Sequence, residues 1–162
     1  MRVGIVVNPD AGLGGRLGFK GSDGRAKEAR DAGAQDRAGP RMRQCLGKFT
    51  ELLKSSLNRD NINPELFAWE GRMGGDWLAG VEYEQRQPSP SESTATDTAA
   101  LVLDLVSANV DAILYAGGDG TTRDIVNALD GHDTPLIGVP AGVKMHSGCF
   151  ATTPNAAAEV LL

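Results

Sequence analysis

The sequence predicts a doubly wound α/β domain, in which a mostly parallel sheet carries helices on both faces. Short apolar runs such as residues 3–7 are continuous and rich in β-branched side chains, which is typical of strands buried on both faces. Segments with the helical spacing of apolar residues lie between these runs, and alternating strands and helices indicate this fold class. The chain has 162 residues, of which 41% are hydrophobic, so it suits one domain with a buried core.

The first predicted strand, at residues 3–7, is ended by Asn8-Pro9. A long segment then follows, because residues 10–40 are rich in Gly, Ala, Arg and Asp and show little apolar periodicity. Unstructured segments of this length are usually functional or mobile. We expect only one short helix within it, at residues 25–34.

Residues 41–57 predict a helix that buries one face, since apolar side chains recur there at intervals of three or four. A second strand is expected at residues 66–69. A short helix at residues 76–78 and a third strand at residues 81–85 complete the first half of the chain. The apolar positions of the long helix are Met42, Leu46, Phe49, Leu53 and Leu57.

The second half of the chain continues the alternation of helices and strands. Thr94 and Asp97 have the spacing of a capping box, which predicts a helix from there to Ala108. Thr153 followed by Pro154 predicts the start of a final helix, with an N-cap and a first-turn proline. The elements expected between them are a strand at residues 111–116, a helix at 122–129 and a strand at 136–140.

Residues 117–121, Gly-Gly-Asp-Gly-Thr, join a predicted strand to a predicted helix. Such a junction offers unpaired backbone N–H groups and the positive end of a helix dipole to an anion. Its three glycines let the chain take positive φ and let a ligand approach the backbone closely. A loop that only binds phosphate has no use for Asp119, because two negative groups repel each other. Either a metal ion bridges them or Asp119 acts on a hydroxyl, and both possibilities suggest phosphoryl transfer.

Three motifs, in this order, resemble one kinase family. Residues 117–121 are similar to the signature of the superfamily of NAD kinases, diacylglycerol kinases and phosphofructokinases. Residues 8–24, which begin Asn-Pro-Asp-Ala-Gly, resemble the opening of the ATP-NAD kinase family typical of archaea and some bacteria. Residues 138–148, which contain Pro-Ala-Gly-Val-Lys, are similar to a later segment of that family. The resemblance covers almost the whole chain, from residue 3 to residue 154.

The resemblance implies the N-terminal domain of a two-domain kinase, in which residues 1–162 form the nucleotide-binding α/β domain. In that family a mostly β domain follows and holds much of the NAD site. Here the chain ends at residues 156–162, inside an apolar helix without a capping residue. We therefore expect the β-rich domain to be absent and the domain to be truncated at its C-terminal end.

The activity that the resemblance implies is phosphorylation of the ribose 2′-hydroxyl of NAD, with ATP or polyphosphate as donor, to give NADP. Mg²⁺ would come with ATP, with no direct metal ligand expected from the protein. Asp119 would take the proton of the hydroxyl or orient it. The residues expected at the ATP phosphates are Asn8, Gly117, Gly118, Gly120, Thr121 and Arg123. Further residues of a possible cleft are Lys144, His146 and Ser147.

Other interpretations stay open at this point. Asp119 is alternatively a turn residue that binds backbone amides. Arg123 is alternatively the partner of a surface carboxylate, and His146 is alternatively a structural histidine. The alternative functions are a lipid or sphingoid-base kinase, a homologue of the acetoin-catabolism type, and a non-catalytic nucleotide-binding or oligomerisation module. A dinucleotide-binding reading of Gly12-x-Gly14 fails, because position 17 is leucine.

The net charge of −5 argues against nucleic acid or an anionic membrane as partner. No apolar stretch approaches the ~20 residues needed to cross a bilayer. We therefore expect a cytoplasmic protein, in which Cys45 and Cys149 stay reduced. Because residues 160–162 are apolar, we also expect self-association into a homo-oligomer.

Overall fold

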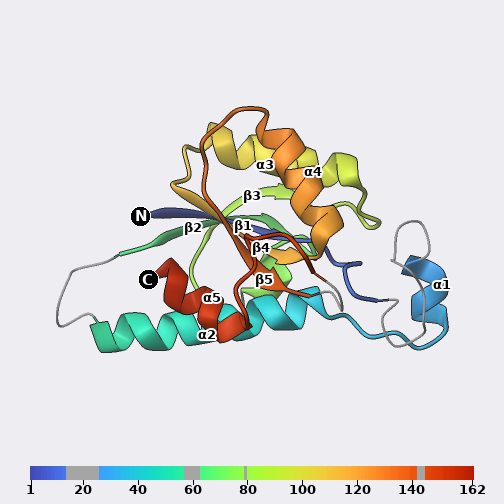
Figure 1. Cartoon of the computed structure of the whole chain (residues 1–162), viewed down its shortest axis with the longest axis horizontal. Coiled ribbons are helices and arrows are strands. Elements are labelled where there is room, and N and C mark those ends of the chain that lie inside the picture. Colours follow the sequence, from blue (N-terminus) through green and yellow to red (C-terminus); the bar gives the residue numbers. More distant parts are fainter. Residues whose placement is uncertain (14–25, 57–62, 79, 142–144) are drawn as a thin grey trace.

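The computed structural model describes residues 1–13, 26–56, 63–78, 80–141 and 145–162, and its centre is a five-stranded sheet (Figure 1). The strand order is β3-β2-β1-β4-β5, and every neighbouring pair is parallel. The predicted doubly wound α/β class is therefore confirmed. The strands are β1 (Arg2–Val7), β2 (Glu65–Glu70), β3 (Glu84–Pro88), β4 (Ala112–Gly117) and β5 (Leu136–Pro140).

Helices cover both faces of this sheet. Helices α3 and α4 pack together on one face, and α2 and α5 pack together on the other (Figure 1). The short helix α1 lies apart from the sheet, beyond one end of α2. The helices are α1 (Ala26–Asp31), α2 (Ala38–Ser56), the 3-10 helix η1 (Gly75–Trp77), α3 (Ala95–Ser107), α4 (Asp119–Leu129) and α5 (Pro154–Leu161).

The central strand β1 shows why its sequence is apolar at consecutive positions. Ile5 packs in the core with α2 and α5, whereas Val6 packs in the core with α3 and α4. Both side chains are fully buried, and each such burial stabilises the fold by about 1.5–3 kcal/mol. Because side chains alternate along a strand, a strand covered on both faces needs apolar residues throughout.

The predicted third strand, at residues 81–85, is placed wrongly. The observed strand β3 begins at Glu84 and ends at Pro88. It is an edge strand with exposed or half-buried side chains, so its sequence carries no apolar pattern that could mark it. Val81, which suggested the earlier start, packs against the core that also holds α2.

Helix α2 begins at Ala38, three residues before the predicted start, and continues through Gly39 and Pro40. A proline is tolerated in the first turn because its missing N–H would have no intrahelical partner there. Gly39 lies so close to the Trp77 ring that a Cβ at this position would overlap it. The glycine therefore allows α2 to approach η1 closely.

The helix starts predicted at Thr94 and Thr153 are confirmed. The backbone N–H of Thr94 donates to Asp97 Oδ2 over 2.8 Å, and the Thr94 hydroxyl accepts from the Asp97 backbone N–H, which completes the capping box of α3. The Thr153 hydroxyl accepts from the backbone N–H of Ala156 at the start of α5. The final residues differ in burial: Leu161 is buried, while Val160 and Leu162 are exposed.

Candidate functional site

The loops after β1 and β4 leave the sheet side by side. The two strands are parallel neighbours in which Val7 pairs with Ala116, and the backbone N–H of Asn8 donates to the Ala116 carbonyl over 3.0 Å. From this pair the strand order runs to β2 and β3 in one direction and to β5 in the other. Ligands of open α/β sheets bind beyond the carboxyl ends of strands at such a switch in strand order. The candidate site is built here.

A side-chain hydrogen bond ties the two loops together. The Asn8 Nδ2 group donates to the Thr121 hydroxyl over 2.9 Å, and Asn8 Oδ1 accepts from the backbone N–H of Asp10. Thr121 is buried, with 3% of its surface exposed. The structure thus brings Asn8 and Thr121, both expected at a phosphate, into contact with each other. Their side chains hold the shape of the loop.

The glycine motif forms the start of α4. Gly118 is the N-cap residue, and the helix begins at Asp119 instead of residue 122. The glycines of the motif do not use the positive φ open to them, because among the described glycines those with positive φ lie elsewhere in the chain. No described residue accepts a hydrogen bond from the backbone N–H groups of Asp119, Gly120 or Thr121.

The three glycines of the motif differ in what surrounds them. A Cβ on Gly117 would lie 2.5 Å from the Thr121 side chain, so packing within the protein requires glycine there. A Cβ on Gly118 or Gly120 would meet no atom within 4 Å. The space beside these two glycines is therefore open to a ligand that approaches the helix start.

Asp119 is held by the loop that follows β5. Its Oδ1 atom accepts from the Ser147 hydroxyl over 2.6 Å and from the Ser147 backbone N–H over 2.9 Å. The backbone N–H of His146 is shared between Oδ1, at 3.1 Å, and Oδ2, at 2.9 Å. These donors, Ser147 first, hold the pKa of the Asp119 carboxyl below its usual range. Asp119 is therefore a carboxylate at neutral pH.

The same geometry brings together three residues that the sequence placed in one site: Asp119, His146 and Ser147. His146 contributes its backbone, and its side chain is exposed. Arg123 is also exposed and makes no ion pair with a described residue, so the proposed surface partner is not observed there. Lys144 and residues 14–25 lie outside the described part of the chain.

The family model of the ATP-NAD kinase N-terminal domain matches residues 3–162. The chain belongs to the ATP-NAD kinase family. This match covers nearly the whole chain and confirms the resemblance drawn from the three sequence motifs. No curated protein and no solved structure matches the chain significantly. Membership in the ATP-NAD kinase family indicates a kinase-like function, that of a phosphotransferase.

One basic side chain at the site of this ATP-NAD kinase domain was not found from the sequence. Arg41, in the first turns of α2, donates from Nη1 to the Pro140 carbonyl over 2.9 Å. Pro140 pairs with Gly117 across the sheet. Among the described residues no carboxylate lies within ion-pair distance of Arg41. Its place became visible only from the register of β4 and β5.

A second missed feature is an ion-pair network beside the loop after β1. Arg30, from α1, binds Asp10 over 2.7 Å, while Asp36 accepts from Arg30 over 3.3 Å and from Arg72 over 2.7 Å. Arg30 also donates to the Pro9 carbonyl. The network fastens α1 to the loops after β1 and β2. No local sequence pattern predicts this network, because its members come from separate segments of the chain.

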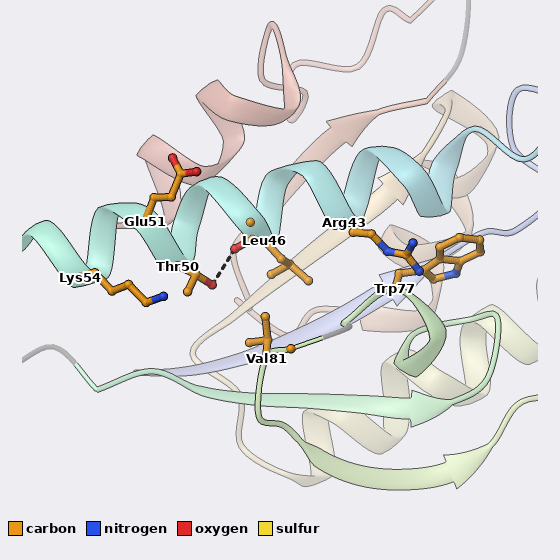
Figure 2. A pocket seen from close by; sticks show the side chains of 9 residues that line it. Arg43, Leu46, Thr50, Glu51, Lys54, Trp77 and Val81 are labelled. Atoms are coloured by element: carbon orange, nitrogen blue, oxygen red, sulfur yellow. Dashed lines mark hydrogen bonds between the residues drawn. The ribbon is translucent and has the colours of Figure 1, made fainter.

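A shallow hollow of about 220 Å³ lies away from this edge of the sheet, along α2 (Figure 2). In it, Arg43 lies by the Trp77 ring, while Lys54 and Glu51 lie farther along the helix. Val81 contributes from the chain after η1. None of its lining residues comes from the loops after β1, β4 or β5, so the hollow is separate from the candidate site of the ATP-NAD kinase domain.

The described residues of this ATP-NAD kinase domain contain neither a metal-binding cluster nor a membrane-spanning helix. No group of three or more His, Cys, Asp or Glu side chains within the described ranges is placed to hold a metal ion. None of the helices formed by these residues is long and apolar enough to cross a membrane.

Proposed function

We propose that residues 1–162 form the ATP-binding half of an NAD kinase, which transfers a phosphoryl group from ATP or polyphosphate to the ribose 2′-hydroxyl of NAD. The observation that carries this proposal is the start of α4. It combines one carboxylate, Asp119, with three backbone N–H groups from which no described residue accepts, and with open space beside Gly118 and Gly120. Membership in the ATP-NAD kinase family supports both substrates.

The start of α4 is suited to the phosphates of the donor. Free N–H groups at a helix N-terminus point at an anion, and the helix dipole adds a partial positive charge. The open space beside Gly120 allows phosphate oxygens to reach the backbone. Arg41, which reaches from α2 to the end of β5, and Arg123, on α4, have no described carboxylate partner and are the cations that we propose for the outer phosphates.

Asp119 acts on the acceptor in this proposal. The 2′-hydroxyl donates a hydrogen bond to the carboxylate, which aligns the hydroxyl oxygen with the γ-phosphorus. The bond from this oxygen to phosphorus forms as the bond from phosphorus to the bridging oxygen breaks. That electron pair leaves with ADP, and the hydroxyl proton passes to Asp119 and then to water.

Mg²⁺ enters this scheme as part of the donor substrate. The described residues offer one carboxylate at the glycine motif and no cluster of metal ligands. That set suits an ion held mainly by phosphate oxygens and water, as Mg²⁺ usually is in kinases. The ion would neutralise charge on the phosphates, which reduces their repulsion of Asp119.

The proposal is tested by two measurements on the full chain. Chemical-shift mapping with MgATP should place the largest changes at residues 117–123 and around Asn8. Changes confined to α2 would contradict it.

The acceptor is identified by offering labelled ATP together with NAD, NADH, a sphingoid base and diacylglycerol. We expect the label to appear in NADP. A labelled lipid would favour the lipid-kinase alternative, and binding without any product would favour the non-catalytic module.

A further inference from the structure

The two carboxylate oxygens of Asp119 differ in the number of hydrogen bonds that they accept. Oδ1 accepts from the Ser147 hydroxyl at 2.6 Å, from the Ser147 N–H at 2.9 Å, and from the shared His146 N–H at 3.1 Å. Oδ2 accepts only the other share of the His146 N–H, at 2.9 Å, from a described residue. A carboxylate oxygen has about two acceptor positions. Counting the described residues, Oδ1 is therefore saturated, while Oδ2 keeps one position open.

The donors that saturate Oδ1 are themselves fixed to the sheet. Directly after Ser147 and Gly148, the backbone carbonyl of Cys149 accepts from the Gly138 N–H over 2.8 Å. The backbone N–H of Ala151 donates back to the Gly138 carbonyl over 3.0 Å. Phe150, between them, packs against Tyr115 with the two rings tilted by 56° and their centroids 5.4 Å apart. The segment that carries Ser147 is thus anchored to β5 and β4.

Asp119 is anchored independently, because it begins α4. Beneath it the Tyr115 hydroxyl, which is buried, lies 2.6 Å from the Thr122 hydroxyl, and the Thr122 backbone N–H donates to the Gly118 carbonyl. Both sides of the contact are therefore tied to the sheet, Asp119 through the Thr122–Tyr115 hydrogen bond and Ser147 through the bonds of Gly138. A hydrogen-bonded pair between two anchored segments limits the rotation of the Asp119 side chain.

We propose that Ser147 is a positioning residue for the phosphoryl transfer, which holds Asp119 so that only Oδ2 receives the acceptor hydroxyl. This inference rests on the function proposed above. Ser147 touches neither the donor nor the acceptor in this role. It saturates Oδ1 with two hydrogen bonds and turns the open position of Oδ2 to the substrate.

The arrangement also defines how Asp119 contributes to the reaction. Hydrogen bonds to the charged form make the carboxylate a weak base. A loose transition state for phosphoryl transfer needs little proton removal before the new bond forms. Oδ2 therefore orients the hydroxyl first and takes its proton late, as the bond from the acceptor oxygen to phosphorus is completed and ADP departs.

Other ionisable groups lie near Asp119 in the structure or follow it on the same helix, and their effects must be separated from that of Ser147. His146 lies next to it on the loop, Arg123 and Asp124 follow it on α4, and Tyr115 lies beneath it on β4. Replacing Ser147 leaves all of them in place. A change in the Asp119 titration in a Ser147 variant therefore reports the lost hydroxyl.

The test compares Ser147→Ala with Ser147→Thr, which keeps the hydroxyl. Ser107→Ala serves as the matched control, because the Ser107 hydroxyl bonds to a backbone carbonyl at the end of α3. Titration of the Asp119 carboxyl by carbon NMR needs no turnover. We expect its pKa to rise in Ser147→Ala and to return toward the wild-type value in Ser147→Thr. An unchanged Asp119 pKa in a folded Ser147→Ala variant would overturn the positioning role.

Turnover gives the second measurement. In Ser147→Ala we expect kcat for NADP formation to fall about 10–100-fold, while KM for MgATP stays within about twofold. The acid limb of the rate profile should move to higher pH. A shifted pKa with unchanged kcat would also overturn the inference. The wild-type chain could transfer no phosphoryl group while the Asp119 pKa still rises in Ser147→Ala. That result would contradict the proposed function but would confirm that Ser147 binds Asp119.

Discussion

The side-chain amide of Asn8, at the end of β1, donates to the hydroxyl of Thr121, 113 residues later, over 2.9 Å. Thr121 is buried in the first turn of α4. This one bond joins the two loops that leave the sheet at its switch in strand order. The shape of the glycine motif therefore depends on a residue from the other end of the sequence.

Replacing Asn8 with alanine should destabilise the fold by about 1–3 kcal/mol, because the buried Thr121 hydroxyl loses its donor at 2.9 Å and keeps only the Gly118 N–H at 3.5 Å. Urea unfolding measures this change. Asn127→Ala is the control, since Asn127 is exposed on the same helix, and its free energy of unfolding should change by less than about 0.5 kcal/mol. Equal effects of the two substitutions would show that the Asn8 bond carries no stability.

Gly120→Ala should separate folding from phosphate binding. Its Cβ would meet no protein atom within 4 Å, and alanine favours a helix over glycine by about 1 kcal/mol. We expect unchanged or higher stability together with at least tenfold weaker binding of MgATP, because the methyl group occupies the space that a phosphate would use.

Gly47→Ala is the matched control for this substitution. Gly47 also lies within a helix, α2, and has no atom within 4 Å of its Cβ position. It should gain stability without any change in MgATP affinity. Calorimetric titration measures both affinities. Equal affinities in the two variants would place the phosphates away from Gly120.

The two cysteines should differ in their reactivity toward a thiol reagent. Burial raises the pKa of Cys45 to about 12, whereas Cys149 is half-buried. The thiolate is the reactive form, so one thiol should react in the native protein at pH 8 and the second only after unfolding. The Cys45 thiol ionises above pH ~8.5 in the unfolded chain but only near pH 12 in the folded one. The free energy of unfolding should therefore fall as the pH rises through this range. Fast reaction of both thiols would contradict the buried position.

Several features of the fold follow from the sequence on physical grounds. Consecutive apolar residues mark β1 and β4, because both faces of these strands are covered. The Thr94 and Thr153 caps mark the starts of α3 and α5, because their hydroxyls replace missing helical acceptors. Edge strand β3 carries no such signal, since its side chains are largely exposed.

The candidate site was predictable only in part. Residues 117–121 predict a junction between a strand and a helix, but helix α4 starts at Asp119 and not at residue 122 as expected. The contact of Asp119 with Ser147 joins residues 28 positions apart. It depends on how the chain returns beside β5, which no local pattern records. The same is true of Arg41, whose carbonyl partner is 99 positions away.

The central claim is that Asp119 acts on the acceptor hydroxyl, and Asp119→Asn tests it most directly. The asparagine oxygen can still accept from Ser147, but the amide nitrogen that replaces Oδ2 can neither accept the hydroxyl hydrogen bond nor take the proton. Loss of such a group slows turnover by ~10²–10⁴, or about 3–5 kcal/mol of barrier.

The decisive measurement is NADP formation and MgATP binding for the same Asp119→Asn protein, with unfolding followed alongside. We expect turnover to fall by ~10²–10⁴, while MgATP affinity changes by at most about tenfold, because backbone groups supply the phosphate contacts. Stability should hold to roughly 1 kcal/mol. Turnover within a factor of about three of the wild type would contradict the account and leave Asp119 as a residue that only binds the loop after β5.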